Sequence, residues 1–186
     1  DGNDTFTILG NPEGFDTING GSGSDMILGS EWSDTLSLAN AASNLEGIET
    51  IDLGGDFDKI RLTNGDDHLD LSGIAIHGVE LIDAGAGNDI IIASAADDIL
   101  KGGIGNDTFE FRGDFGHDTI IDFETGIGSA HDMVDFAASG FIDFSHVLAE
   151  ASEVNGDTVI TMDETRSLTL TGISLQSLTA DHFMFA

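Results

Sequence analysis

Residues 102–110 read Gly-Gly-Ile-Gly-Asn-Asp-Thr-Phe-Glu, and this nine-residue pattern recurs along the chain. Close copies are Gly-Gly-Ser-Gly-Ser-Asp-Met-Ile-Leu at residues 20–28 and Ala-Gly-Ala-Gly-Asn-Asp-Ile-Ile-Ile at residues 84–92. In each copy glycines come first, an acid follows, and a large apolar residue stands two places after the acid. A short fixed period of this kind indicates a repeat architecture, so it is interpreted before any other feature.

The acid is the most regular element of the pattern. Twelve acids stand two places before a large apolar residue, and seven of their eleven separations are nine residues. They are Asp4, Asp16, Asp25, Asp34, Glu49, Asp58, Asp67, Glu80, Asp89, Asp98, Asp107 and Asp118. The period therefore survives even in copies that have lost their glycines.

This period predicts an all-β fold, a right-handed parallel β-roll. Glycines permit the positive φ and close backbone approach of a tight turn, and the next three residues are enough for one short strand. Turn plus strand makes half a coil, so about eighteen residues complete one coil and parallel strands stack at ~4.8 Å. The residues expected to point inward are Phe6, Ile18, Ile27, Leu36, Ile51, Ile60, Leu69, Ile82, Ile91, Leu100, Phe109 and Ile120.

The acids are then expected in two rows, one along each edge of the roll. The pairs predicted to stack are Asp16 with Asp34, Glu49 with Asp67, Glu80 with Asp98, and Asp89 with Asp107. Two carboxylates about 5 Å apart repel by roughly 3 kcal/mol at an effective dielectric of about 20. Several such pairs rival the whole stability of a domain, ~5–15 kcal/mol, so the chain without cations is expected to be loose or unfolded.

Several bound Ca²⁺ ions are predicted to offset this repulsion. Carboxylate and carbonyl oxygens on a flexible loop favour calcium over zinc, copper or magnesium. The candidate metal-binding residues are Asp16, Gly20, Gly21, Gly23, Asp25, Asp34, Asp58, Asp67, Gly85, Gly87, Asp89, Asp98, Gly102, Gly103, Gly105, Asp107 and Asp118. In the weaker copies an Asp after Gly has a second interpretation, as a turn former. Glu49 and Glu80 are interpreted as structural rungs without metal.

Composition excludes several classes of function. Thirty-five acids against five Lys and Arg give a formal charge of −30, which excludes nucleic acid as a partner because binding it needs a basic face. No cysteine is present, so disulfides and thiolate metal sites are excluded. No apolar run approaches the ~18 residues of a membrane span.

The repeats and the tail predict two domains. Residues 1–122 are expected to form the roll, with irregular insertions near 37–43 and 71–74, and residues 123–186 a cap. The cap is expected to contain a helix over 144–153, a hairpin of strands 158–162 and 167–171, and helical turns at 174–178 and 179–183. The chain begins in the second half of a repeat, so we expect it to be part of a longer protein.

The repeats resemble those of RTX proteins exported by Gram-negative type I secretion systems. The tail resembles their C-terminal flank, in Asp-Thr-Ile-Ile-Asp-Phe at 118–123, Leu-Thr-Leu at 168–170 and Asp-His-Phe-Met-Phe at 181–185. The resemblance implies calcium-driven folding after export, a C-terminal secretion signal, and a secreted or cell-surface location with the type I secretion machinery as a partner. The chain departs from the family in residues 38–83, where glycines are missing and Glu replaces Asp.

No catalytic motif appears, so the chain itself is not expected to be an enzyme. The preferred function is a calcium-dependent folding and secretion module of a larger protein. The alternatives are a calcium-dependent adhesin or polysaccharide-binding module, or the non-catalytic C-terminal part of a secreted polysaccharide-modifying enzyme or protease. Trp32 favours a bound extracellular glycan, although packing against the neighbouring loop is its other interpretation.

Overall fold

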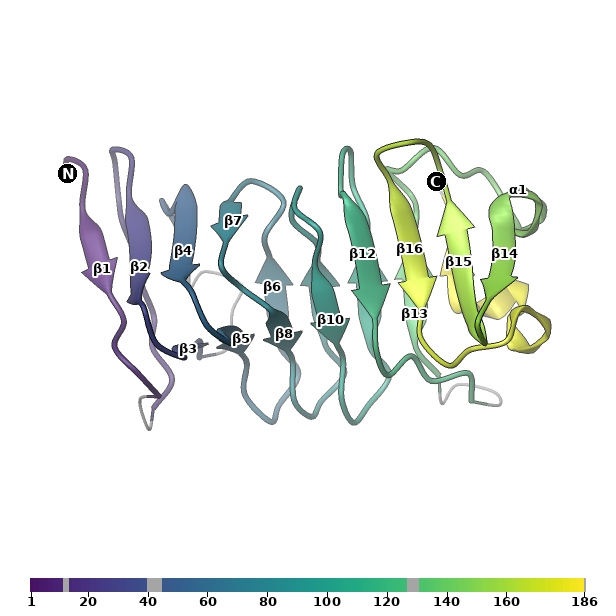
Figure 1. Ribbon diagram of the computed structural model, residues 1–186, viewed down its shortest axis with the longest axis horizontal. Coiled ribbons are helices and arrows are strands. Elements are labelled where there is room, and N and C mark those ends of the chain that lie inside the picture. The colour runs from purple at the N-terminus through teal and green to yellow at the C-terminus, as the bar shows by residue number, and fades with distance from the viewer. Residues whose placement is uncertain (12–13, 40–44, 127–130, 186) are drawn as a thin grey trace.

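The computed structural model describes residues 1–11, 14–39, 45–126 and 131–185. These residues form an elongated roll of short strands, with the N-terminus at one end and the helix α1 at the other (Figure 1). Of the predicted insertion at 37–43, residues 40–43 lie outside the described part.

The elements are short, as a repeat of nine residues requires. The strands are β1 (Thr5–Thr7), β2 (Met26–Ser30), β3 (Thr35–Ser37), β4 (Thr50–Gly54), β5 (Lys59–Arg61), β6 (His68–Asp70), β7 (Ala75–His77), β8 (Leu81–Asp83), β9 (Ile90–Ile92), β10 (Ile99–Lys101), β11 (Thr108–Glu110), β12 (His117–Ile120), β13 (Met133–Asp135), β14 (Ala151–Val154), β15 (Asp157–Thr161), β16 (Ser167–Leu170) and β17 (Phe183–Met184). The helix is α1 (Phe144–Glu150), and 3-10 turns cover Leu175–Ser177 and Ala180–His182. No helix in the described residues is both long and apolar enough to cross a membrane.

Three sheets run along the roll. Sheet I has the order β1-β2-β4-β7, sheet II the order β14-β15-β16-β12-β10-β8-β5-β3, and sheet III the order β17-β13-β11-β9-β6. Within the described residues the strand pairs of the roll are parallel, and the antiparallel pairs are β14–β15 and β15–β16 in the cap. The predicted all-β parallel roll is therefore confirmed.

Coil length corrects the prediction of a uniform two-strand coil. The acids at the start of β9 and β11, Asp89 and Asp107, are 18 residues apart, as predicted. Earlier acids stack at 21, 22 or 24 residues, and the 22-residue coil from Asp67 to Asp89 carries a third strand, β7. Around the 71–74 insertion, Ile74 and Ile76 are buried and β7 pairs with β4 in sheet I. This additional strand widens the roll.

The core contains two apolar rows instead of the single predicted one. The predicted inward residues from Ile27 to Ile120 are at most 1% exposed, and Ile18 is 7% exposed. A second buried set stands four places after the acid: Leu38, Leu53, Leu62, Leu71 and Phe111. Three-sided coils need this second row to fill their wider interior.

The cap covers the last coil with aromatic side chains. Phe111 packs against Phe115 and Phe136, and Phe136 packs against Phe141 and Phe183. As predicted, a helix and a hairpin form here. The helix is shorter than expected, because residues 151–154 form β14 and pair with β15. Asn155 and Gly156 both have positive φ, which suits a two-residue hairpin turn better than a longer helix.

Candidate metal sites

Stacked glycine turns precede β2, β9 and β11. In the turn at residues 102–107, Gly103 and Gly105 have φ of 100° and 150°. A Cβ atom on Gly103 would lie 2.0 Å from the Gly85 carbonyl oxygen, and one on Gly105 would lie 1.6 Å from that of Gly87. Carbonyl oxygens of one turn therefore face the glycines of the next, and only glycine allows this approach.

The acids lie in rows at the ends of these turns, joined through backbone amides. The N–H of Asp67 donates to Asp89 Oδ1 at 2.8 Å, and the N–H of Asp89 donates to Asp107 Oδ1 at 2.9 Å. Comparable bonds run from Asp4 to Asp25, Asp25 to Glu49, Asp34 to Asp58, Asp58 to Glu80, Asp98 to Asp118 and Asp107 to Asp132. Each bond uses one carboxylate oxygen of the acid one coil further on.

Two of the predicted stacks are wrong and two are correct. Glu80 and Asp98 precede the paired strands β8 and β10, and Asp89 stacks on Asp107. Glu49 stacks on Asp25 instead of Asp67, because the coil that joins Asp25 to Glu49 is 24 residues long and not 18.

Asp16 does not stack on Asp34. It bridges to Leu38, just after β3, whereas Asp34 stands just before that strand. The exposed Asp16 therefore lies outside the acid rows.

The second carboxylate oxygen is open in many of these acids. It is buried and accepts no hydrogen bond from the described residues in Asp25 (Oδ2), Asp58 (Oδ2), Asp67 (Oδ1), Asp89 (Oδ2), Asp107 (Oδ2) and Asp118 (Oδ2). All six residues are at most 3% exposed. A buried charged oxygen without a partner is costly, and such a group in a folded protein calls for a bound ion or water.

The pKa values of the buried acids also indicate that a positive charge is needed beside them. Burial, together with the neighbouring Asp107 and Asp67 carboxylates, raises the pKa of Asp89 to about 7. Burial and the nearby Asp98 raise the pKa of Asp118 to about 9. Without a cation, the folded chain thus favours the protonated form of carboxyl groups that water would keep ionised.

The open oxygens lie against the glycine backbone of their turns. Asp107 Oδ2 would be 2.3 Å from a Cβ on Gly102, and Asp25 Oδ2 would be 2.5 Å from one on Gly20. Only glycine therefore permits this approach, and carbonyl oxygens line the same turns. An all-oxygen donor set on flexible loops suits Ca²⁺. No group of three or more acid or His side chains in the described residues could hold a metal alone, so backbone carbonyls are needed as further ligands.

Other acids have no open oxygen. The N–H and Oγ–H of Ser94 donate to the two oxygens of Asp98, at 2.8 and 3.1 Å. The N–H and Oγ–H of Ser30 donate to Asp34 Oδ2 at 2.6 and 2.8 Å, and the N–H of Gly10 donates to its Oδ1. In these turns the protein itself satisfies the carboxylate.

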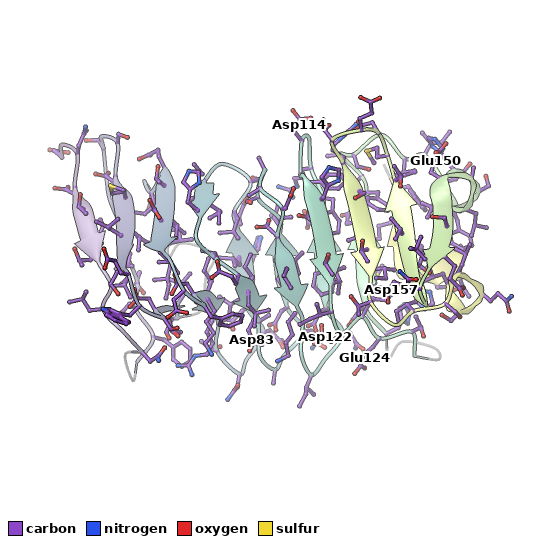
Figure 2. All side chains as sticks on the ribbon, viewed as in Figure 1. Asp83, Asp114, Asp122, Glu124, Glu150 and Asp157 are labelled. Atoms are coloured by element: carbon purple, nitrogen blue, oxygen red, sulfur yellow. The ribbon has the colours of Figure 1, made fainter. Side chains whose placement is uncertain are left out.

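Sequence reasoning missed two acids beside the last glycine turn. Asp132 accepts the N–H of Asp107 with Oδ1 at 2.9 Å and continues its row. Asp122 accepts the N–H groups of Gly102 and Gly103, at 3.1 and 2.9 Å, and lies on one long edge of the roll with Asp83 and Glu124 (Figure 2). The signal available for Asp132 was Val134, a large apolar residue two places after it.

The family model of the RTX calcium-binding nonapeptide repeat matches residues 13–36 and 78–109, in four copies. The chain therefore contains RTX calcium-binding nonapeptide repeats, as the resemblance predicted. No curated protein sequence matches it significantly.

Three solved structures are similar in part. The AlgE6R2 subunit of the Azotobacter vinelandii mannuronan C5-epimerase has 27% identity and a TM-score of 0.46, over 68% of this chain and 92% of that one. The AlgE6R3 subunit of the same epimerase has 24% identity and a TM-score of 0.45, over 96% of this chain and 84% of that subunit. The extracellular lipase LipA of Serratia marcescens has 18% identity and a TM-score of 0.43, over 100% of this chain and 38% of the lipase.

Proposed function

We propose that this chain is a calcium-dependent folding and secretion module of a larger exported protein. Calcium ions bind between stacked turns of the roll, and the type I secretion machinery exports the parent protein. Any catalytic domain lies outside residues 1–186, and the working location is extracellular or on the cell surface. The matched RTX repeats support this proposal.

The observation that carries the proposal is the set of six buried carboxylate oxygens without hydrogen-bond partners. They occur in stacked turns, in a chain with a formal charge of −30. A bound divalent cation supplies the positive charge and the coordination that each open oxygen lacks. Binding free energy then becomes folding free energy, because the unfolded chain has no preformed site.

This coupling explains how the module responds to its surroundings. At low cytosolic calcium, mutual repulsion of the acids opposes folding and leaves the chain extended for export. Outside the cell, calcium in the millimolar range occupies sites of the ~10⁻⁴–10⁻³ M affinity typical of extracellular modules. Ligand that binds only the folded form stabilises it by mass action.

A calcium titration followed by far-UV circular dichroism tests the proposal, with magnesium at equal concentration as the control. We expect a cooperative coil-to-strand transition with calcium alone. A chain that has the same strand content in chelator as in calcium would contradict calcium-dependent folding.

A second candidate function is binding of a neutral extracellular glycan, favoured by one observation. Trp32 is 74% exposed and Phe57 is 56% exposed. Exposure of this extent argues against the other interpretation of Trp32, packing against the neighbouring loop. Exposed aromatic rings provide a surface on which sugar rings stack. Titration of wild type and Trp32→Ala with neutral oligosaccharides by calorimetry tests this function. Binding that is equal in the two proteins, or absent in wild type, excludes a role for Trp32.

A further inference from the structure

We infer that the residue four places before a repeat acid decides whether its turn takes calcium. Glycine at that position leaves the carboxylate open to a cation, whereas serine or threonine closes it with internal hydrogen bonds. The inference rests on the calcium binding proposed above and specifies which turns of the roll carry it.

Glycine stands at this position in four turns. Gly21, Gly54, Gly85 and Gly103 precede Asp25, Asp58, Asp89 and Asp107 by four residues. In all four turns the Oδ2 atom of the acid is buried and accepts no hydrogen bond from the described residues. These acids are at most 1% exposed, so bulk solvent does not reach the missing partner's position.

Serine or threonine stands there in three turns. Ser30, Thr63 and Ser94 precede Asp34, Asp67 and Asp98 by four residues. Each donates both its backbone N–H and its hydroxyl to the carboxylate, with donor–acceptor distances of 2.6–3.1 Å. Ser94 reaches both oxygens of Asp98. Ser30 and Thr63 reach only Oδ2 of their acids, and the N–H of Gly10 bonds the other oxygen of Asp34. These donors provide partners that a cation would otherwise provide.

The backbone separates the same two classes. The four glycines have φ between 86° and 101°, in the left-handed region that side chains rarely adopt. Ser30, Thr63 and Ser94 do not have positive φ. The negative-φ turn directs its N–H and hydroxyl at the acid, whereas the glycine turn directs its amide elsewhere. In the last glycine turn, the Gly103 N–H donates to Asp122.

Two turns show how the rule extends. Thr63 engages only Oδ2 of Asp67, at 2.8 Å for its N–H, and Oδ1 remains open. Asp67 is therefore half closed. Asp118 has Asp114 four places before it, which supplies no such donor, and its Oδ2 is open. Asp118 therefore belongs with the cation-binding acids.

The rule assigns calcium ligands to Asp25, Asp58, Asp89, Asp107 and Asp118, and excludes Asp34 and Asp98 from metal binding. Closed turns alternate with open ones along the edge that leads into sheet II. The carboxylate oxygens of Asp34 and Asp98 accept hydrogen bonds from the protein itself, so these turns hold parts of that edge together without metal.

Matched substitutions in neighbouring turns test this assignment. Calcium titrations by isothermal calorimetry would compare wild type, Asp107→Asn and Asp98→Asn. We expect Asp107→Asn to lose one bound ion, or to weaken one site by about tenfold or more, because affinity follows the number of charged ligands. Asp98→Asn should bind as many ions as wild type. Loss of an ion in Asp98→Asn would overturn the inference.

The pair Asp25→Asn and Asp34→Asn repeats this comparison if Asp107→Asn does not fold in saturating calcium. Wild type that binds no calcium would contradict the proposed function itself. If wild type binds calcium but substitution of open and closed acids changes the number of bound ions equally, only the rule about the residue four places before the acid is contradicted.

A gain of binding provides an independent test. Ser94→Gly removes the hydroxyl and permits the left-handed backbone, and we expect it to bind one ion more than wild type. Ser94→Thr keeps both donors and should bind the wild-type number. Equal ion counts in Ser94→Gly and Ser94→Thr would show that Ser94 does not control access to Asp98.

Discussion

The acids that lead into sheet III and those that lead into sheet II share one arrangement but satisfy their charges differently. Before sheet III, Asp67, Asp89 and Asp107 each retain an open buried oxygen. Before sheet II, the closed acids Asp34 and Asp98, bonded by Ser30 and Ser94, alternate with the open acids Asp58 and Asp118. Burial of a carboxylate requires a partner. In the closed turns the protein's own hydroxyl and amide groups supply it, and in the open turns the proposed cation does.

The pKa values follow the same division in part. Burial acts to raise the pKa of Asp34, but hydrogen bonds from Ser30 and Gly10 outweigh it and the pKa is lowered. At Asp89 burial and neighbouring carboxylates prevail, and the pKa is raised to about 7. At Asp98, burial raises the pKa despite the two bonds from Ser94. Closure by serine therefore lowers the cost of burial without always removing it.

The largest expected effect is that of pH on the metal-free chain. The raised pKa values, about 7 for Asp89 and about 9 for Asp118, mean that the folded form binds more protons than the unfolded form. This stability is present below the ordinary carboxyl pKa and is lost as the pH rises through the raised values. Circular dichroism of dialysed protein should show more strand near pH 5 than near pH 8.5, with calcium restoring strand at the higher pH. Strand content without metal that is equal at both pH values, or greater at the higher one, would contradict this.

A glycine substitution should break the open turns directly. In Gly103→Ala the new Cβ meets the Gly85 carbonyl oxygen at 2.0 Å, in a backbone with φ of 100°. We expect a loss of roughly 3 kcal/mol or more in the free energy of unfolding, measured by urea denaturation in saturating calcium. Gly55→Ala is the matched control, because a Cβ there meets nothing within 4 Å. Equal losses in the two variants would show that the close stacking of turns is not responsible.

The smallest expected effect comes from the closed turns. Ser94→Ala removes the hydroxyl that donates to Asp98 Oδ1 at 3.1 Å and leaves the backbone donor in place. The same hydroxyl also accepts the N–H of Ala96 at 3.0 Å, so the variant loses two hydrogen bonds. The expected cost is about 2 kcal/mol, from a usual net value of about 1 kcal/mol for each bond. Thermal denaturation of Ser94→Ala and of Ser152→Ala, at an exposed position of β14, would measure it. Identical midpoints would mean that the hydroxyl contributes nothing to the closed turn.

Local patterns were sufficient to predict much of the fold. The positions of Gly103, Asp107 and Phe109 within one repeat predict a turn, an edge carboxylate and a buried side chain, and the structure places all three accordingly. The helix at 144–150 was also predictable, because Asp143 caps it by accepting the N–H of His146. Each of these features depends on residues close together in the sequence.

The stacking of distant coils was not predictable in the same way. The period of nine implies coils of two strands, but β7 adds a third strand in the middle of the roll, and Asp25 meets Glu49 across a coil of 24 residues. Strand pairing between coils depends on how the whole interior is filled, including the second apolar row at Leu53, Leu62 and Leu71. A nine-residue window contains no information about that packing.

The sequence by itself thus determined the repeat, the parallel roll, the inward apolar row and the calcium-binding character, because each follows from the spacing of a few residue types. Only the tertiary structure decided which acids face one another and which oxygens remain open. In the sequence, Asp98 and Asp107 differ in the residue four places before them, Ser94 and Gly103. Only the structure shows that this difference matters, because Ser94 donates to Asp98 whereas Asp107 Oδ2 has no such donor among the described residues.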